Sequence, residues 1–250
     1  MIQLKTARQL DGIRTSCKLL IETFKFVEPL IQVGVSTKEV DAKVHDYITS
    51  RGGRPSFLGY NGFPASICAS VNEMVIHGIP DDTPLKEGDI VGIDIGIDLD
   101  GYFSASAVTY AVGTVDGRIR ELMKATKESL FLGIERAKVG NRIKDISGAV
   151  YGHTKDKGYG VVRPYCGHGV GLAIHEDPQV PNYVGRGPNP RLKPGMVLAI
   201  EPMINLGGDD VYVAEDDWTV ITADHSISAH FEHTVAILED RTEIMTLDPS

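Results

Sequence analysis

The feature that most constrains the fold of this chain is an internal repeat in its sequence. Residues 85–94 align with residues 192–201 through shared leucine, lysine, glycine and isoleucine, and each segment ends in a carboxylate. In both halves a cysteine precedes a histidine by nine residues and a proline by twelve: Cys68, His77 and Pro80, then Cys166, His175 and Pro178. Two matches in the same order predict a duplicated half-domain. We expect one domain over 1–250, with pseudo-repeats of about 1–115 and 116–250 facing a central site.

The predicted secondary structure has the same order in both halves. Apolar residues spaced three and four apart predict helices over 6–27, about 36–52, 119–138 and 143–157. The first two helices begin at Thr6 and Ser36, each with a glutamine or glutamate three residues on, as in a capping box. Strand-like stretches follow each pair of helices, over 55–112 and from 161 onward. Helices and strands are grouped rather than alternating singly, which indicates an α+β fold.

Composition excludes several classes of function. The net charge is −9 and the sequence has no basic run, so DNA or RNA is not expected as the main ligand. No apolar stretch approaches the 18 residues of a membrane span, and the N-terminus lacks the apolar core of a signal peptide. The three cysteines form no CxxC pair and are expected as free thiols. We therefore expect a cytoplasmic protein with no membrane partner.

One predicted strand carries a carboxylate between two glycines. Over residues 90–97 apolar side chains alternate with small or acidic ones, so that Asp94 shares its strand face with Gly92 and Gly96. We expect the missing side chains to leave open space beside the Asp94 carboxylate. A metal ion or another ligand needs such space.

The Asp100-Gly101 pair that follows is typical of a two-residue hairpin turn. Such a turn sets Asp94 opposite Ala107 and Ala105 opposite Gly96. Ala105 then lies on the same face as Asp94 and diagonal to it.

The repeat also indicates which residue type to expect at position 105. In the second half, the segment 231–235 follows Glu201, and aligning the two halves sets Glu232 against Ala105. Two-fold symmetry therefore predicts a carboxylate at position 105, where the sequence has an alanine.

Three histidines are candidates for function. His168 lies in a glycine-rich run over 167–171, so that little bulk is expected around its imidazole. His77 and His175 occupy equivalent positions of the repeat. Three further histidines have no such context and are expected on the surface or in loops: His45, His153 and His225.

Taken together, these motifs resemble the type I methionine aminopeptidases, which belong to the pita-bread metallopeptidases. The resemblance covers nearly the whole chain. It rests on Tyr60-Asn61-Gly62-Phe63-Pro64, Asn72-Glu73, His77-Gly78-Ile79-Pro80, Ile93-Asp94, Gly167-His168-Gly169-Val170-Gly171, His175-Glu176-Asp177-Pro178-Gln179, Ile200-Glu201-Pro202-Met203, Trp218-Thr219 and Phe231-Glu232-His233-Thr234. It implies a single metallopeptidase domain in which two related halves enclose a central antiparallel sheet.

The resemblance also implies two adjacent divalent metal ions held by five side chains. Four of these are present: Asp94, His168, Glu201 and Glu232. The fifth, an aspartate that bridges both ions in the family, corresponds to Ala105. One ion keeps three protein ligands, which suffices for a catalytic site, whereas the other keeps Asp94 and a share of Glu232. One imidazole and several carboxylates are compatible with manganese, cobalt, iron and zinc alike, so the ligand types do not identify the metal.

The implied reaction is metal-assisted removal of the N-terminal methionine from new polypeptides with a small second residue. Glu201 is implied as base and proton shuttle, His175 as donor to the carbonyl oxygen, and His77 as a contact to the substrate backbone. A small apolar pocket is implied for the methionine side chain, at Phe57, Tyr60, Phe63, Cys68, Ile174 and Trp218.

The sequence is compatible with three interpretations. The first is an enzyme impaired by Ala105, acting as a monomer on methionyl peptides and on chains at the ribosome. The second is a catalytically inactive protein of the same fold that binds peptides or a partner. The third is a relative that cleaves beside proline or hydrolyses creatine-like amidines, and the absence of room for a large N-terminal domain argues against it.

Overall fold

The structure, a computed structural model, describes residues 1–248. Over these residues the helices are α1 (Ala7–Val27), η1 (Glu28–Leu30), α2 (Thr37–Thr49), η2 (Tyr60–Gly62), α3 (Gly117–Arg136) and α4 (Ile143–Lys155). The four predicted α-helices are confirmed. At the starts of α1 and α2, the side chains of Thr6 and Ser36 accept the backbone N–H of the third helical residue. Both predicted capping boxes are present, which fixes where these helices begin.

The strands form antiparallel sheets. They are β1 (Arg54–Pro55), β2 (Cys68–Val71), β3 (Met74–Ile76), β4 (Ile90–Leu99), β5 (Tyr102–Ala111), β6 (Gly160–Val161), β7 (Gly167–Gly169), β8 (Glu176–Val180), β9 (Val197–Ile200), β10 (Met203–Asn205), β11 (Val211–Val213), β12 (Val220–Thr222), β13 (Ser228–His230), β14 (His233–Ile237) and β15 (Thr242–Ile244). The largest sheet has the order β15-β14-β9-β7-β8, and β4 pairs with β1, β2 and β5 in the next. The smaller sheets are β13-β10-β6 and β11-β12-β3.

The predicted hairpin is confirmed. Asp94 pairs with Ala107 and Gly96 with Ala105. The free edge of β5 then joins the second half of the chain, because Ala107 and Glu232 exchange backbone hydrogen bonds of 3.4 and 2.9 Å. The Thr109 hydroxyl adds a 2.6 Å bond to the carbonyl of residue 230. The strands that carry the predicted site residues therefore meet in the middle of the molecule.

The sequence repeat corresponds to a repeated turn. Its shared glycine adopts a left-handed backbone conformation in both halves, with φ of +90° at Gly88 and +86° at Gly195. Other residues rarely adopt this conformation, which explains why glycine recurs there. Each turn feeds a strand that leads to a carboxylate, β4 to Asp94 and β9 to Glu201.

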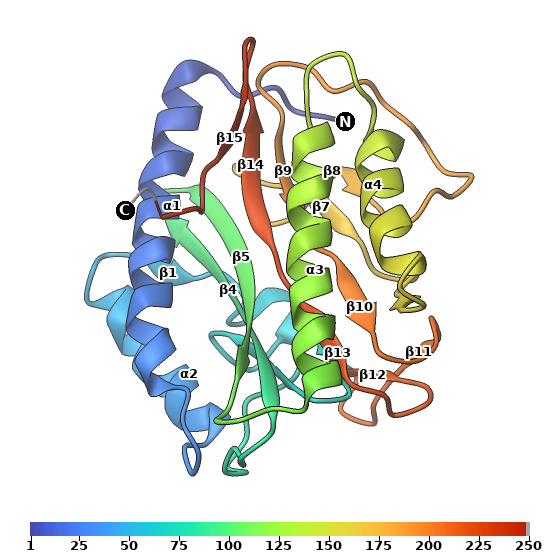
Figure 1. The fold of residues 1–250 in the computed structure, drawn as a ribbon. Coiled ribbons are helices and arrows are strands. Elements are labelled where there is room, and N and C mark those ends of the chain that lie inside the picture. The colour runs from blue at the N-terminus through green and yellow to red at the C-terminus, as the bar shows by residue number, and fades with distance from the viewer. Residues whose placement is uncertain (249–250) are drawn as a thin grey trace.

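Helices cover one side of the strands. In Figure 1, α1, α3 and α4 lie in front of the sheets, with β14 visible between α1 and α3. One apolar core packs α1 and α2 against β2 and β4, and another packs α3 and α4 against β9 and β14. The α+β fold is confirmed, and the face of the strands away from these helices is left to form the site. Over residues 1–248, no helix combines the length and apolar character needed to cross a membrane.

Candidate active site

A cavity of about 720 Å³ opens between the two halves of the chain. Its walls include every residue that the sequence proposed for metal binding, catalysis or substrate binding: Phe57, Tyr60, Phe63, Cys68, His77, Asp94, His168, Ile174, His175, Glu201, Trp218 and Glu232. Ala105 also lines it. Residues far apart in the sequence are thus collected in one space.

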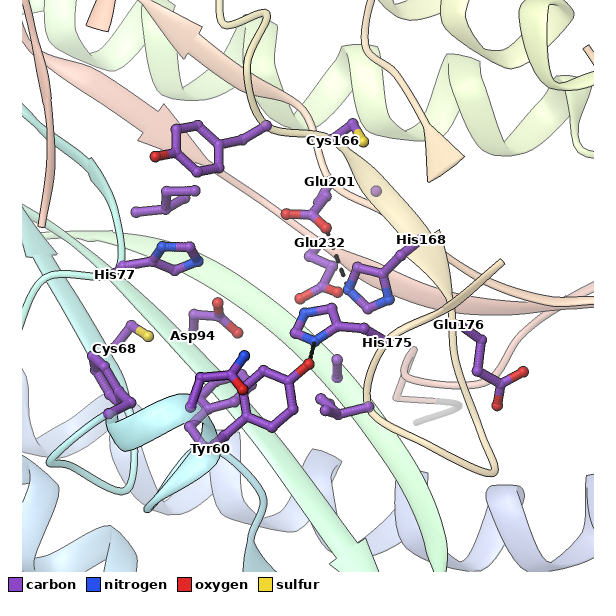
Figure 2. Close-up of a pocket in the computed structure, with 18 of the residues that line it drawn as sticks. Tyr60, Cys68, His77, Asp94, Cys166, His168, His175, Glu176, Glu201 and Glu232 are labelled. Atoms are coloured by element: carbon purple, nitrogen blue, oxygen red, sulfur yellow. Dashed lines mark hydrogen bonds and ion pairs between the residues drawn. The ribbon is translucent and has the colours of Figure 1, made fainter. Parts of the chain in front are cut away.

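One end of the cavity is a cluster of an imidazole and two carboxylates (Figure 2). His168 lies on β7, Glu201 directly after β9, and Glu232 between β13 and β14. One ligand atom from each of these residues lies within 4.8 Å of those of the other two. His168 Nε2 and Glu201 Oε1 lie 3.5 Å apart. This spacing leaves room for one cation among three ligands.

Asp94 lies on β4 beside this cluster and points into the same cavity (Figure 2). Its Oδ1 atom is buried and has no hydrogen-bond partner among residues 1–248. A buried carboxylate oxygen without a partner is costly, so a cation or donor from outside the chain is needed to satisfy it. Ala105, diagonal to Asp94 across the hairpin, contributes only a methyl group.

The glycines beside these residues serve a different purpose from the one expected. A β carbon on Gly96 would lie 2.2 Å from Ser56 Oγ and 2.8 Å from the ring of Phe57. Beside His168, β carbons on Gly167 and Gly169 would lie 2.3 Å from carbonyl oxygens of adjacent backbone. Open space does lie beside Asp94 and His168, because both line the cavity, but Gly96, Gly167 and Gly169 are not what provides it. The absence of a β carbon instead lets the side chains of Ser56 and Phe57 approach Gly96, and lets adjacent backbone approach Gly167 and Gly169. Only at Gly92 would a β carbon meet ordinary contacts, the nearest at 3.6 Å.

Burial controls the charge of the cluster. Desolvation, opposed by His230 and helped by the charge of Glu201, raises the pKa of Asp94 to about 7, and desolvation raises that of Glu201 to about 8. Desolvation and the charges of Asp94 and Glu201 also raise the pKa of Glu232. Desolvation lowers the pKa of His168 to about 3, helped by His175. At neutral pH the imidazole is uncharged and the carboxylates hold protons that a cation would displace.

Two further histidines face the same space. His175 Nδ1 lies 2.8 Å from the Tyr60 hydroxyl, and the His175 ring contacts that of His168 at a centroid distance of 4.4 Å. His77 meets Tyr165 edge to face at 5.7 Å. Desolvation lowers the pKa of both His175 and His77, that of His77 to about 4. Both rings are therefore neutral at pH 7, with ring N–H groups available as donors.

The other end of the cavity is apolar. Phe63 and Cys68 are buried there, and Trp218 packs edge to face on Phe63 at a centroid distance of 5.1 Å. Phe57 packs against the same group. An apolar pocket next to a cluster of ligand atoms is suited to a substrate with an apolar side chain beside a reacting polar group.

Comparison with known proteins identifies the family. The sequence model of metallopeptidase family M24 matches residues 11–239. The chain belongs to metallopeptidase family M24. This M24 peptidase is 49% identical over 247 residues to the methionine aminopeptidase of Treponema pallidum, with 98% of this chain and 96% of that one covered. It is 48% identical over 246 residues to methionine aminopeptidase 1 of Bacillus subtilis, with 98% and 99% covered.

A solved structure agrees with these relatives. The crystal structure of methionine aminopeptidase from Rickettsia prowazekii matches with a TM-score of 0.96 at 40% identity, over 99% of this chain and all of that one. The resemblance to type I methionine aminopeptidases and the pita-bread fold are confirmed. The chain is thus a hydrolase of the metallopeptidase class.

Membership of a metallopeptidase family implies the use of a divalent metal ion, and the residues of this M24 peptidase fit one. His168, Glu201 and Glu232 offer one imidazole nitrogen and carboxylate oxygens close together. Asp94 adds an oxygen that has no other partner. Borderline divalent cations are bound by donor sets of this kind.

One histidine of the M24 site, His230, is not among the residues predicted from the sequence. His230 is 3% exposed, and its Nε2 atom lies 3.4 Å from Glu201 Oε2 without a hydrogen bond to any residue in 1–248. Glu201 therefore lies between two imidazoles, those of His168 and His230. A signal was available, because His230 precedes Glu232 by two residues and side chains two apart share a strand face.

Histidines expected elsewhere do lie outside the cavity. His225 is exposed in a turn, as expected. His45 and His153 are half-buried on α2 and α4, where they pair with Ser66 and Glu128 instead of lying in loops. None of these three lines the cavity of the M24 peptidase.

The buried carboxylates predict an unusual pH dependence for the metal-free M24 peptidase. Asp94 and Glu201 bind protons more tightly when folded, so the free energy of unfolding falls as the pH rises toward 7 and 8. Histidines with lowered pKa, such as His168 and His77, act oppositely, but only below their unfolded pKa of about 6.5. We expect maximum stability near pH 6.5 and a loss of about 2 kcal/mol by pH 8.

Urea unfolding of the metal-free protein at several pH values measures this. Excess Mn²⁺ should restore most of the loss at pH 8, because a cation replaces the displaced protons. Constant stability between pH 6.5 and 8 without metal would contradict the prediction.

Proposed function

We propose that this M24 peptidase removes the N-terminal methionine from polypeptides whose second residue is small. One observation carries the proposal: a single cavity joins a cluster suited to a divalent cation with an apolar pocket. The methionine side chain would occupy the pocket formed by Phe57, Tyr60, Phe63, Cys68, Ile174 and Trp218. The scissile bond would then lie beside Glu201, His77 and His175.

The side chains at the polar end of the cavity would have distinct roles. His168, Glu201 and Glu232 would hold a divalent ion, with Asp94 beside them. When bound, such an ion activates water and polarises the peptide carbonyl group. The Glu201 carboxylate, freed of its own proton by the cation, would accept the proton of the attacking water and pass it to the leaving amine.

His175 would stabilise the charge that develops on the carbonyl oxygen. When its Nδ1 atom accepts a hydrogen bond from the Tyr60 hydroxyl, the ring proton lies on Nε2, which is then the donor to that oxygen. His77, on the far side of Asp94 in Figure 2, would contact the substrate backbone.

The alanine at position 105 would weaken the site. An aspartate there would add one oxygen ligand beside Asp94 and the cluster, and the chain has none. We infer that the position nearest His168 keeps a metal ion weakly, and that a second position, at Asp94 and Glu232, is mostly empty. Manganese, cobalt, iron and zinc all suit the remaining ligands.

The pocket assignment predicts the effect of Trp218→Ala. Loss of the indole should raise KM for a Met-Gly-led peptide about tenfold in the Ala105→Asp protein, because the methionine side chain loses apolar contact area. Steady-state kinetics measures this, with Tyr212→Ala as a control because Tyr212 is exposed and outside the cavity walls. An unchanged KM in Trp218→Ala would show that the Trp218 indole does not contact the methionine side chain of the substrate.

A second candidate is a catalytically inactive protein that binds methionyl peptides or a partner. The observation that favours it is Ala105, which leaves the cluster without one carboxylate. The other proposed ligands and catalytic residues are all present and line one cavity, which argues for the enzyme.

The deciding experiment is release of methionine with excess Mn²⁺, from a Met-Gly-led and a Met-Ile-led peptide. We expect the Ala105→Asp variant to cleave the first and spare the second, and the present chain to cleave slowly or not at all. The variant could also release no methionine while calorimetry shows that the chain binds the intact peptide. That result would favour the interpretation as a binding protein over that as an enzyme.

We propose that residues 1–250 act as one catalytic domain of two related halves, about 1–115 and 116–250. Support comes from the cavity, because both halves supply its walls. We place this activity in the cytoplasm, in a monomer acting on chains that emerge from the ribosome. The three cysteines are free, as a reducing compartment would keep them.

A further inference from the structure

The segment before α1 takes no part in the proposed mechanism, yet it contains a deeply buried ion pair. Lys5 Nζ lies 2.5 Å from Glu176 Oε2, and the two side chains are only 1% and 4% exposed. Lysine and glutamate are rarely so buried, because each charge loses its hydration. A pair kept under these conditions calls for a structural reason.

Glu176 uses its second oxygen to close a loop. Its Oε1 atom accepts hydrogen bonds from the backbone N–H groups of Leu172 and Ala173, at 2.7 and 3.1 Å. The carboxylate therefore fixes the loop over 172–176 from one side while Lys5 holds it from the other. Such charge-assisted bonds are stronger than neutral ones.

Lys5 is itself fixed to the second half of the chain. Its backbone N–H donates to the Gly195 carbonyl at 2.7 Å, and its ammonium also donates to the Gln3 carbonyl at 3.3 Å. A β carbon on Gly171 would lie 3.3 Å from Lys5 Cε and 2.5 Å from Ile13 Cδ1. The N-terminal segment, α1 and the loop are therefore in close contact.

The residue next to Glu176 is His175. It directly precedes β8, and Figure 2 shows His175 directed into the cavity and Glu176 directed away from it. The His175 ring meets Tyr60 and His168 at its tip, whereas its backbone is held by the neighbouring Glu176. The imidazole therefore lies one residue from the Lys5–Glu176 pair along the chain.

We propose that Lys5 is a positioning residue, and that the N-terminal segment acts through Glu176 to hold His175 at the catalytic cavity. The catalytic part of this inference rests on the proposed function, whereas the structural part does not. Without Lys5, the Glu176 carboxylate would be a buried charge with no counterion. Its movement toward water would carry the 172–176 loop and the His175 backbone with it.

Histidine NMR tests the structural part on the chain as it is. With ¹³C-labelled histidine rings, Lys5→Met should shift or broaden the His175 signal and leave that of His233 in place. His233 is a suitable internal reference because it bonds to Thr246, away from the cavity. Lys38→Met is the control variant, since Lys38 forms an exposed 2.7 Å pair with Asp82. An unmoved His175 signal in Lys5→Met would overturn the proposal.

Kinetics in the Ala105→Asp background tests the catalytic part. Lys5→Met should lower kcat at least tenfold and change KM less than twofold, because a misplaced donor affects the transition state more than binding. Lys38→Met should change neither. If Ala105→Asp releases no methionine, the proposed function fails while the NMR result still decides the role of Lys5.

A double variant separates positioning from stability. Lys5→Met with Glu176→Gln removes both charges and keeps an acceptor oxygen for the loop, so the melting temperature should return close to that of the parent. The His175 signal and kcat should remain altered. Recovery of both in the double variant would show that the pair only avoids an unpaired buried charge, and would overturn the proposal.

Discussion

Replacing Ala105 by aspartate is expected to raise the rate of methionine release at least about 100-fold, the scale on which single groups around a metal site alter activity. The backbone at this position is already fixed. Ala105 N–H donates to Thr234 Oγ1 at 3.3 Å, and the Thr234 hydroxyl donates to the Ala105 carbonyl at 2.7 Å. A new carboxylate would therefore project into the cavity on the face of Asp94, beside Glu232, without a change of register.

The charge balance of the site leads to the same expectation. Two divalent cations carry four positive charges, and Asp94, Glu201 and Glu232 supply three negative ones. The fourth carboxylate would neutralise the pair of cations and add an oxygen ligand. Removing two divalent cations from water without full compensation of their charge is costly, so the present chain should not hold both ions tightly.

Calorimetric titration with Mn²⁺ measures the metal stoichiometry, and a methionine-release assay measures the rate. The present chain should bind one ion weakly, and Ala105→Asp should bind two. Ala105→Asn is the matched control, because it has the shape of aspartate without its charge and should gain little. Equal binding of two ions by the present chain and Ala105→Asp would contradict both the site assignment and the inferred impairment.

Local signals made much of the fold predictable. The capping residues Thr6 and Ser36 fixed two helix starts, and Asp100-Gly101 fixed a turn whose register follows by counting. From that register alone, Ala105 could be placed beside Asp94. Such features depend on a few neighbouring residues, so the sequence contains all that is needed to find them.

Features that depend on distant segments could not be found in this way. The Lys5–Glu176 pair joins residues 171 positions apart, and nothing near either residue indicates the other. The glycines beside His168 were misinterpreted for the same reason, because the adjacent backbone that they admit comes from elsewhere in the chain. His230 differs from these, since its spacing of two residues from Glu232 is a local signal that indicates a shared strand face.

Glu201→Gln is expected to abolish methionine release while making the metal-free chain more stable. The Glu201 carboxylate is proposed as both metal ligand and proton shuttle, and an amide can neither take up the proton nor supply the negative charge. Loss of general acid–base catalysis alone lowers rates by about 10²–10⁴-fold. We expect at least a 1,000-fold loss in the Ala105→Asp background.

The stability gain follows from the raised pKa of Glu201. Burial raises that pKa to about 8, so folding at pH 8 opposes ionisation of a group that is fully ionised in the unfolded chain. Glutamine is neutral in both states and keeps nearly the same volume between His168 and His230. The free energy of unfolding of the metal-free protein should therefore rise by about 3 kcal/mol at pH 8, and by much less near pH 5.

Urea unfolding at pH 5 and pH 8, with and without Mn²⁺, measures these effects against Glu239→Gln, a control at an exposed site. Mn²⁺ should stabilise the parent and the control at pH 8 and have little effect on Glu201→Gln. A variant less stable than the parent at pH 8 without metal would show that the carboxylate contributes to folding through its contacts with His168 and His230. A more stable variant that no longer binds Mn²⁺ or releases methionine would show that the buried charge is kept for the reaction at a cost to the fold.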